Sequence, residues 1–182
     1  MKREIAPEII TNMDFKLMSY QVHQFDNGCM LYNFPYSDVA VSKIDFIFPA
    51  GTWYQTQAMQ SYFTAKMLTE GTTKMSDEQI AIILDEFGAS LNVSIGKDNT
   101  VISLYCLNRN LDNLLPIVHE ILTDSCFPEK QLNILLQNQK QEFIISLERV
   151  SFLATRALDN AIWGSNHPYG KIAKIEDFDK IN

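Results

Sequence analysis

The sequence predicts an α+β protein, a two-layer sandwich in which helices pack on one face of a mostly antiparallel sheet. Three observations indicate this fold. Alternating apolar residues occupy 20–49 and return between positions 91 and 107. Apolar residues at helical spacing fill 57–87 and most of 111–163. Strands that are grouped against helices on one face indicate the two-layer sandwich.

The first strands are predicted from alternation and turn residues. Residues 20–33 and 39–49 are expected to form a strand pair, with a turn at Asp26-Asn27-Gly28 inside the first segment. The second segment ends at Pro49. A later hairpin is predicted from Leu91 to Leu107, because alternating apolar residues flank a turn at positions 96–99.

Two helices are predicted between these strands. The first covers 57–70, where Met59, Phe63 and Met67 recur every four residues and form a core-facing stripe. The second begins at Ser76, because a serine followed three residues later by Gln79 is a capping box. The second helix is expected to end at Gly88, where a C-terminal cap favours positive φ.

Three further helices complete the chain. Asn110 can cap a helix. The predicted buried face of this helix consists of Leu111, Leu114, Leu115, Val118, Ile121 and Leu122. Phe127-Pro128 is expected to end that segment. A long helix over 129–146 and another over 150–163 follow, the last ending at Gly164.

Composition limits the possible functions. The 182 residues carry a net charge of −7, which argues against nucleic-acid binding and against attraction to anionic membranes. The three cysteines are far apart, show no metal-ligand spacing and are interpreted as buried thiols. No apolar stretch follows the charged N-terminus, so a signal peptide is not predicted and a cytoplasmic location is expected. Residues 1–182 are expected to form a single domain, the N-terminal fragment of a longer two-domain or multi-domain protein.

The segment 59–72 has the outline of a zinc-protease helix without its chemical groups. It reads Met-Gln-Ser-Tyr-Phe-Thr-Ala-Lys-Met-Leu-Thr-Glu-Gly-Thr. An inverted zinc motif, His-x-x-Glu-His, places two imidazoles four residues apart on one helix face, with a catalytic glutamate beside the second. The three corresponding residues here are Tyr62, Ala65 and Lys66. A phenol, a methyl group and an ammonium group cannot bind zinc and activate water in that geometry.

Five stretches of this chain carry a family resemblance. They are Phe46–Tyr54 with Gln55 where an acid is usual, the frame 59–72 with Gly71-Thr72, Asp85–Asn92, Cys126–Pro128 and Trp163–Gly170. In this order they resemble the N-terminal domain of the pitrilysin/insulinase family of inverted-zinc metallopeptidases. That family includes the mitochondrial processing peptidases and the respiratory-complex core proteins. The resemblance covers most of the chain and implies a pitrilysin-like metallopeptidase domain.

The same resemblance implies that zinc, the family's cofactor, has lost its ligands here. The family's third ligand is a glutamate on a later long helix. Counting back from His167 by the family's usual spacing places this ligand at Phe143. The neighbouring Glu142 is displaced by about 100° around a helix. Glu142 could pair with Lys66, or both side chains could instead be solvated. No bound cofactor is expected.

The resemblance therefore implies a catalytically inactive zinc-peptidase homologue. It would be the non-catalytic subunit or half of a processing-peptidase-like assembly, partnered by a related zinc-containing subunit or by its own C-terminal half. An extended peptide substrate would add to the strand around 89–95, where Ser90, Asn92 and Ser94 are the candidate contacts. No nucleic-acid or membrane partner is expected. Two alternatives remain: an active zinc metalloendopeptidase with ligands not recognised here or supplied by a missing part of the chain, and a stand-alone peptide-binding or scaffolding protein.

Overall fold

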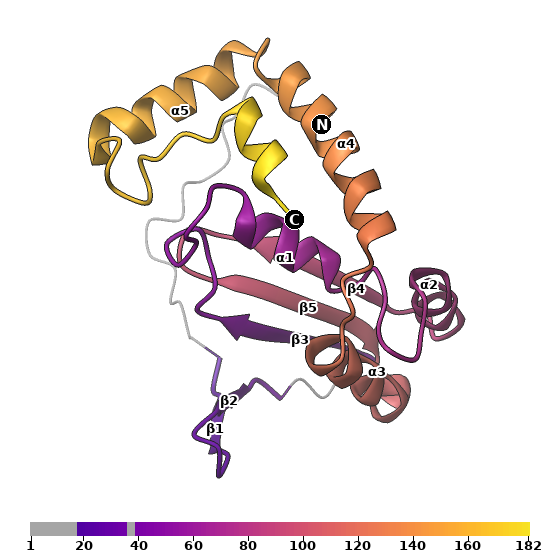
Figure 1. The fold of residues 1–182 in the computed structure, drawn as a ribbon. Coiled ribbons are helices and arrows are strands. Elements are labelled where there is room, and N and C mark those ends of the chain that lie inside the picture. Colours follow the sequence, from indigo (N-terminus) through magenta and orange to yellow (C-terminus); the bar gives the residue numbers. More distant parts are fainter. Residues whose placement is uncertain (1–17, 36–38) are drawn as a thin grey trace, which may run out of the picture. The chain divides into compact units, whose positions relative to one another are not determined.

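The computed structural model describes residues 18–35 and 39–182, and the chain divides into two compact units. The first unit ends at Val39 and the second runs from Ala40 to Asn182. In the first, β1 (Gln21–Gln24) and β2 (Met30–Asn33) form an antiparallel hairpin (Figure 1). The turn predicted inside 20–33 is therefore confirmed.

The second unit contains a three-stranded antiparallel sheet. Its strands are β3 (Val41–Phe48), β4 (Ser90–Ile95) and β5 (Thr100–Leu107), in the order β3-β5-β4. The predicted pairing of 39–49 with 20–33 is wrong, since β3 pairs with β5 along all eight of its residues. This register places Ile44 and Phe46 of β3 beside Leu104 and Ile102, two buried residues of β5. The apolar pairing explains why β3 pairs with β5 rather than with the nearer segment 20–33.

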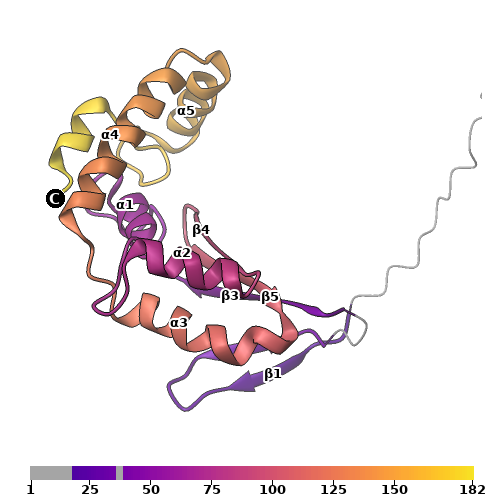
Figure 2. The same cartoon turned by 90° about the vertical axis from the view of Figure 1, so that its right-hand side faces the viewer.

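Three helices join this sheet in the second unit. They are α1 (Gln60–Met67), α2 (Asp77–Glu86) and α3 (Leu111–Thr123). Figure 1 shows α1 in front of the strands, and Figure 2 shows α2 and α3 from the side. The central cluster is built by Leu104, Cys106, Leu114 and Val118, all at most 2% exposed. The predicted α+β class is confirmed.

The start of α2 has the predicted capping box. The Gln79 amide donates to Ser76 Oγ (3.2 Å), and the Ser76 amide donates to Gln79 Oε1 (2.9 Å). Gly88 follows the helix with φ of +58°, which confirms the expected positive φ. In contrast, α1 is shorter than the predicted 57–70. Met59 has a left-handed backbone with φ of +68°, so the helix cannot begin before Gln60.

The helix α3 starts directly after Asn110, as predicted, but Asn110 makes no capping bond. Its side-chain amide donates instead to the carbonyl oxygen of Phe87 (2.8 Å). Leu114 is 0% exposed, whereas its predicted companion Leu115 is 37% exposed. One residue rotates a helical side chain by about 100°, which moves Leu115 off the buried stripe.

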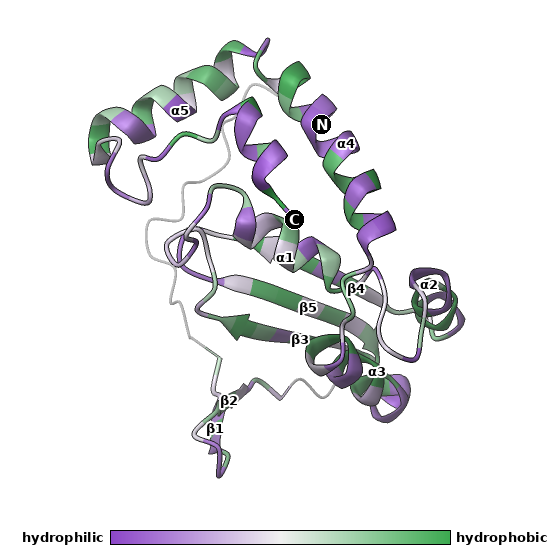
Figure 3. Ribbon diagram, viewed as in Figure 1, coloured by the Kyte–Doolittle hydropathy of each residue, from purple (hydrophilic) through white to green (hydrophobic). Residues whose placement is uncertain are grey.

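The last helices have the predicted bounds. They are α4 (Glu129–Ser146) and α5 (Val150–Trp163), followed by the short 3₁₀ helix η2 (Ile175–Lys180). Unlike α3, neither α4 nor α5 contains a fully buried residue. Apolar segments recur along α5 in Figure 3, and its exposed apolar residues include Val150 and Ile162. Within residues 18–35 and 39–182, no helix is both long and apolar enough to cross a membrane.

Candidate functional site

The helix α1 carries Tyr62, Ala65 and Lys66, the three residues predicted to replace the zinc motif. Its first turn is held by Gln60, whose Oε1 accepts hydrogen bonds from the Thr56 amide (3.1 Å) and hydroxyl (3.0 Å). Phe63 and Met67, at 2% and 1% exposure, anchor the helix in the core. Tyr62 and Lys66 are partly exposed, whereas Ala65 is buried.

Tyr62 lies near the acidic residue predicted beside the third-ligand position. Burial raises the pKa of the Tyr62 phenol, and the negative charge of Glu142 on α4 raises it further. The charge of Glu142 on α4 therefore reaches Tyr62 on α1, two helices that are far apart in the sequence. A phenol with a raised pKa stays protonated at neutral pH, so Tyr62 does not offer a phenolate oxygen to a metal.

Lys66 and Glu142 do not form an ion pair within the part of the chain that the structure describes. Glu142 is exposed and accepts a hydrogen bond from Gln139 Nε2 (3.0 Å). The positive charge of Lys66 acts on Glu70 instead. Burial and the charge of Asp77 raise the pKa of Glu70, and Lys66 partly opposes that rise.

Phe143, the residue predicted at the third-ligand position, lies within an aromatic cluster. The Phe143 ring lies 5.3 Å from that of Phe178 and 5.9 Å from that of Phe152, and Phe178 also meets Phe63 at 5.9 Å. Arg156 covers the cluster, with its guanidinium carbon 5.1 Å from the centres of the Phe143 and Phe152 rings. We call these five residues the aromatic plug.

These side chains do not fit a zinc ion. A catalytic zinc site needs three protein ligands with nitrogen, oxygen or sulfur donors, and a fourth position for water. Ala65 and Phe143 offer no donor, and Lys66 offers an ammonium group. In the described ranges, no group of three or more His, Cys, Asp or Glu side chains could hold a metal ion. No reaction step can therefore be assigned to a metal at this place.

The predicted peptide contacts lie on β4, which forms one edge of the sheet. Ser90, Asn92 and Ser94 are exposed and share one face of the strand. Asn92 is paired in register with Ser103 of β5, whose hydroxyl donates to Asp45 of β3 (2.6 Å). The six residues of β4 include no charged side chain. An uncharged edge strand leaves its outer main-chain groups open to pairing.

Comparison with known proteins decides the family. Residues 36–167 match the model of the insulinase family, peptidase family M16. This match covers more than half of the chain. The protein belongs to peptidase family M16.

Similar proteins place this M16 chain among zinc-protease relatives. It is 27% identical over 157 residues to a Rickettsia felis protein described as an uncharacterised zinc protease, covering 84% of this chain and 37% of that protein. It is also 27% identical over 96 residues to the beta subunit of the Neurospora crassa mitochondrial-processing peptidase, covering 50% of this chain and 20% of the subunit. The M16 chain thus spans well under half the length of these relatives.

The fold is shared with a solved M16 structure. A peptidase M16 inactive domain from Pseudomonas fluorescens superposes with a TM-score of 0.78 at 20% sequence identity, covering 88% of this chain and 42% of that one. At this identity the likeness establishes the fold. The order of helices and strands in this chain is therefore that of an M16 fold.

Sequence reasoning missed a pocket on the other side of α1. A cavity of about 370 Å³ lies between this helix, the ends of β3 and β5, and α3. Ala65 is part of its wall, while Tyr62 and Lys66 are not. The available signal in the sequence was a small residue, Ala65, at a buried helical position of this M16 domain. The motif comparison treated it only as a lost catalytic group.

Proposed function

We propose that this chain is a non-catalytic M16 component that contacts peptide substrate. It would work beside a related zinc-containing subunit or beside its own C-terminal half. The observation that carries the proposal is the aromatic plug. At the place where the family resemblance puts a glutamate ligand, Phe143 packs against Phe152 and Phe178 instead. Aromatic packing of this kind offers no donor atom to a metal, while it helps to keep the domain folded.

Peptide contact would use the free edge of β4. An extended peptide that adds to a sheet edge gains main-chain hydrogen bonds, and alternate side chains then meet the surface beside the strand. Ser90, Asn92 and Ser94 would meet the peptide on the exposed face. Their lack of charge suits contact with peptides of varied sequence, because no charged side chain on the peptide is repelled.

The similar proteins support a role in an assembly. One relative is the beta subunit of a processing peptidase, and one structural neighbour is described as an inactive domain. Both are longer than this chain. A paired or multi-domain arrangement would supply a zinc site, since the described residues include no group that could hold a metal ion.

The first experiment measures zinc by mass spectrometry after incubation of the purified chain with the metal. We expect far less than one zinc per chain. The comparison variant carries Tyr62→His, Ala65→Glu and Lys66→His, which rebuild the two imidazoles and the glutamate on α1. We expect it to retain more zinc than the natural chain. One tightly held zinc in the natural chain, together with peptide cleavage, would overturn the proposal and favour the active-endopeptidase alternative.

A second experiment tests the peptide contact by nuclear magnetic resonance. Titration with a neutral extended peptide should shift the amide signals of β4 and leave those of α3 unchanged. The double variant Asn92→Asp/Ser94→Asp adds negative charge to the edge and should weaken binding of an acidic peptide more than that of a neutral one. Shifts spread over α3 rather than β4 would contradict this site. Binding by the isolated chain, with no association to a zinc-containing relative, would favour the scaffold alternative.

A further inference from the structure

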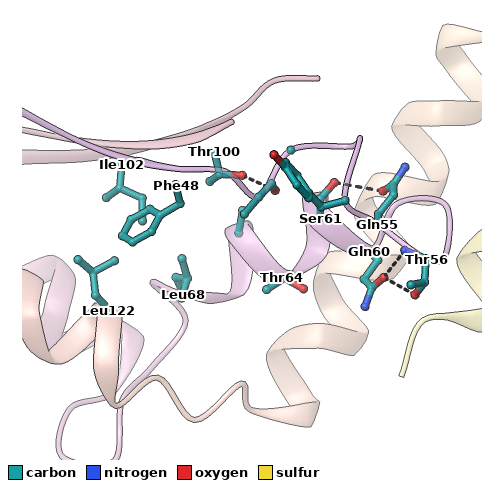
Figure 4. Close-up of a pocket in the computed structure, with 14 residues that line it drawn as sticks. Phe48, Gln55, Thr56, Gln60, Ser61, Thr64, Leu68, Thr100, Ile102 and Leu122 are labelled. Carbon is teal, nitrogen blue, oxygen red and sulfur yellow. Dashed lines mark hydrogen bonds between the residues drawn. The ribbon is translucent and has the colours of Figure 1, made fainter. Parts of the chain in front are cut away.

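The pocket beside α1 has an apolar end and a polar end. Figure 4 shows Phe48, Ile102 and Leu122 together at one end, and Gln55 and Gln60 at the other. One lining residue of the apolar end, Ile102, is only 1% exposed. The cavity volume of about 370 Å³ falls in the range of about 300–1,000 Å³ that is typical of small-molecule sites.

The lining has no formal charge. Charged residues make up 20% of the whole chain, but none of them lines this pocket. A charged ligand would lose hydration on entry and find no opposite charge, so the lining selects for an uncharged molecule.

The polar end offers hydrogen-bond donors. Gln55 Oε1 accepts from the Ser61 hydroxyl (3.1 Å), and Gln60 Oε1 accepts from the Thr56 amide and hydroxyl. Both side-chain carbonyls are thus occupied by the protein. The hydrogen bonds of the described residues use neither of the two side-chain amino groups. A ligand that reaches this end would satisfy them with a carbonyl or hydroxyl oxygen.

Ala65 contributes an uncharged side chain to the pocket wall. It is 3% exposed and occupies the motif position at which an inverted zinc site has its glutamate. A glutamate there would add a carboxylate to the wall or to its immediate neighbourhood. The replacement that removes the catalytic group therefore also leaves a small, uncharged surface beside the cavity.

We propose that this pocket binds a small uncharged molecule with an apolar ring or chain and one carbonyl-type acceptor. The apolar part would pack between Phe48, Ile102 and Leu122, and the acceptor would face the amino group of Gln55 or that of Gln60. This binding site goes beyond the peptide-contact role and does not depend on it. It lies in the body of the domain rather than at the β4 edge.

The test uses three molecules of the same shape and different charge. Benzamide is neutral, benzoate is its anionic counterpart and benzamidinium is its cationic counterpart. Binding is followed through the methyl signals of Leu68, Ile102 and Leu122 in the full chain. We expect benzamide to shift them with a dissociation constant on the order of millimolar, as its small size allows. We expect at least tenfold weaker binding of both charged molecules. Equal binding of all three, or shifts of other methyl groups only, would overturn the proposal.

Two variants test the two ends of the pocket. Thr64→Phe, at an exposed position of α1, fills the mouth and should abolish the benzamide shifts. Its matched control is Thr155→Phe, an exposed position of α5, which should leave them unchanged. Gln60→Glu keeps the oxygen that accepts from Thr56, but it replaces the amino donor with a negative charge. We expect at least a tenfold loss of benzamide affinity. Unchanged binding in Thr64→Phe, with a folded spectrum, would overturn the site.

Discussion

The sheet layer and the α4–α5 arm of the second unit are stabilised in different ways. The sheet layer, made of β3, β4, β5, α2 and α3, contains aliphatic residues that are almost completely removed from water, such as Leu114 and Ile121 at 0% exposure. The arm, made of α4, α5 and η2, has a single fully buried side chain among its described residues, Phe178 at 3%. Substitutions should therefore act globally in the sheet layer and locally in the arm.

The largest effect is expected from Leu114→Ala. The variant leaves a cavity in the middle of the central cluster and should lower the free energy of unfolding by about 3–5 kcal/mol. Leu115→Ala is the matched control, because the neighbouring leucine is 37% exposed and should cost less than about 1 kcal/mol. Urea unfolding followed by circular dichroism measures both. Similar costs for the two variants would contradict the buried stripe assigned to α3.

A smaller and more local effect is expected from Phe178→Ala. Removing this ring deprives Phe63 and Phe143 of a shared neighbour and should cost about 3 kcal/mol. Hydrogen exchange should accelerate at the amides of α4 and η2 and remain slow in β5. Ile145→Ala, at a 54% exposed position of α4, is the control and should change neither. Equal acceleration in β5 would show that the arm and the sheet layer unfold as one.

Removing the capping box of α2 should cost about 1 kcal/mol. Ser76→Ala removes the acceptor for the Gln79 amide, and Gln79→Ala removes the acceptor for the Ser76 amide. Because the two side chains act on the same helix end, the double variant should cost less than the sum of the single variants. Thermal unfolding of the three variants tests this. Strict additivity would mean that the two hydrogen bonds act independently.

The smallest effect is a pH dependence of η2. The Lys180 ammonium group lowers the pKa of Asp177 below its usual 3.8, helped by the Lys174 backbone amide. A carboxyl with a lowered pKa stabilises the folded state above pH 3.8, and that contribution is lost as the pH falls through the lower folded value. The amides of η2 should therefore exchange faster in that window. In the Asp177→Asn variant, amide exchange in η2 should no longer depend on pH in this window. If the variant keeps the same pH dependence, another titrating group causes it.

The sequence could predict those parts of the fold that depend on local signals. The bounds of α4 and α5 were predictable because Pro128 precedes one helix and Gly164 follows the other. The partner of β3 was not predictable, since β5 lies more than fifty residues further along the chain and local alternation does not encode register. Motif spacing also predicts that Ala65 and Lys66 replace the zinc-site residues, and that assignment stays a prediction.

The remainder of the site depends on three-dimensional proximity. The aromatic plug joins Phe63, Phe143 and Phe178, three positions spread over more than a hundred residues. No periodic pattern connects residues at such separations. The pocket was equally hidden, because it is a space left between α1, α3 and the strands, and its lining consists of residue types that are common in any core.

The unguarded edge of β4 has a practical consequence. Natural proteins often block exposed sheet edges with lysine, proline or a bulge, but Ser-Leu-Asn-Val-Ser-Ile contains neither residue and pairs regularly with β5. Another copy of this strand is an equally suitable neighbour. In concentrated solution the chain should therefore tend to associate edge to edge, with growth of turbidity that a competing extended peptide would suppress. The strand best suited to capture a peptide is also the one through which the protein would aggregate.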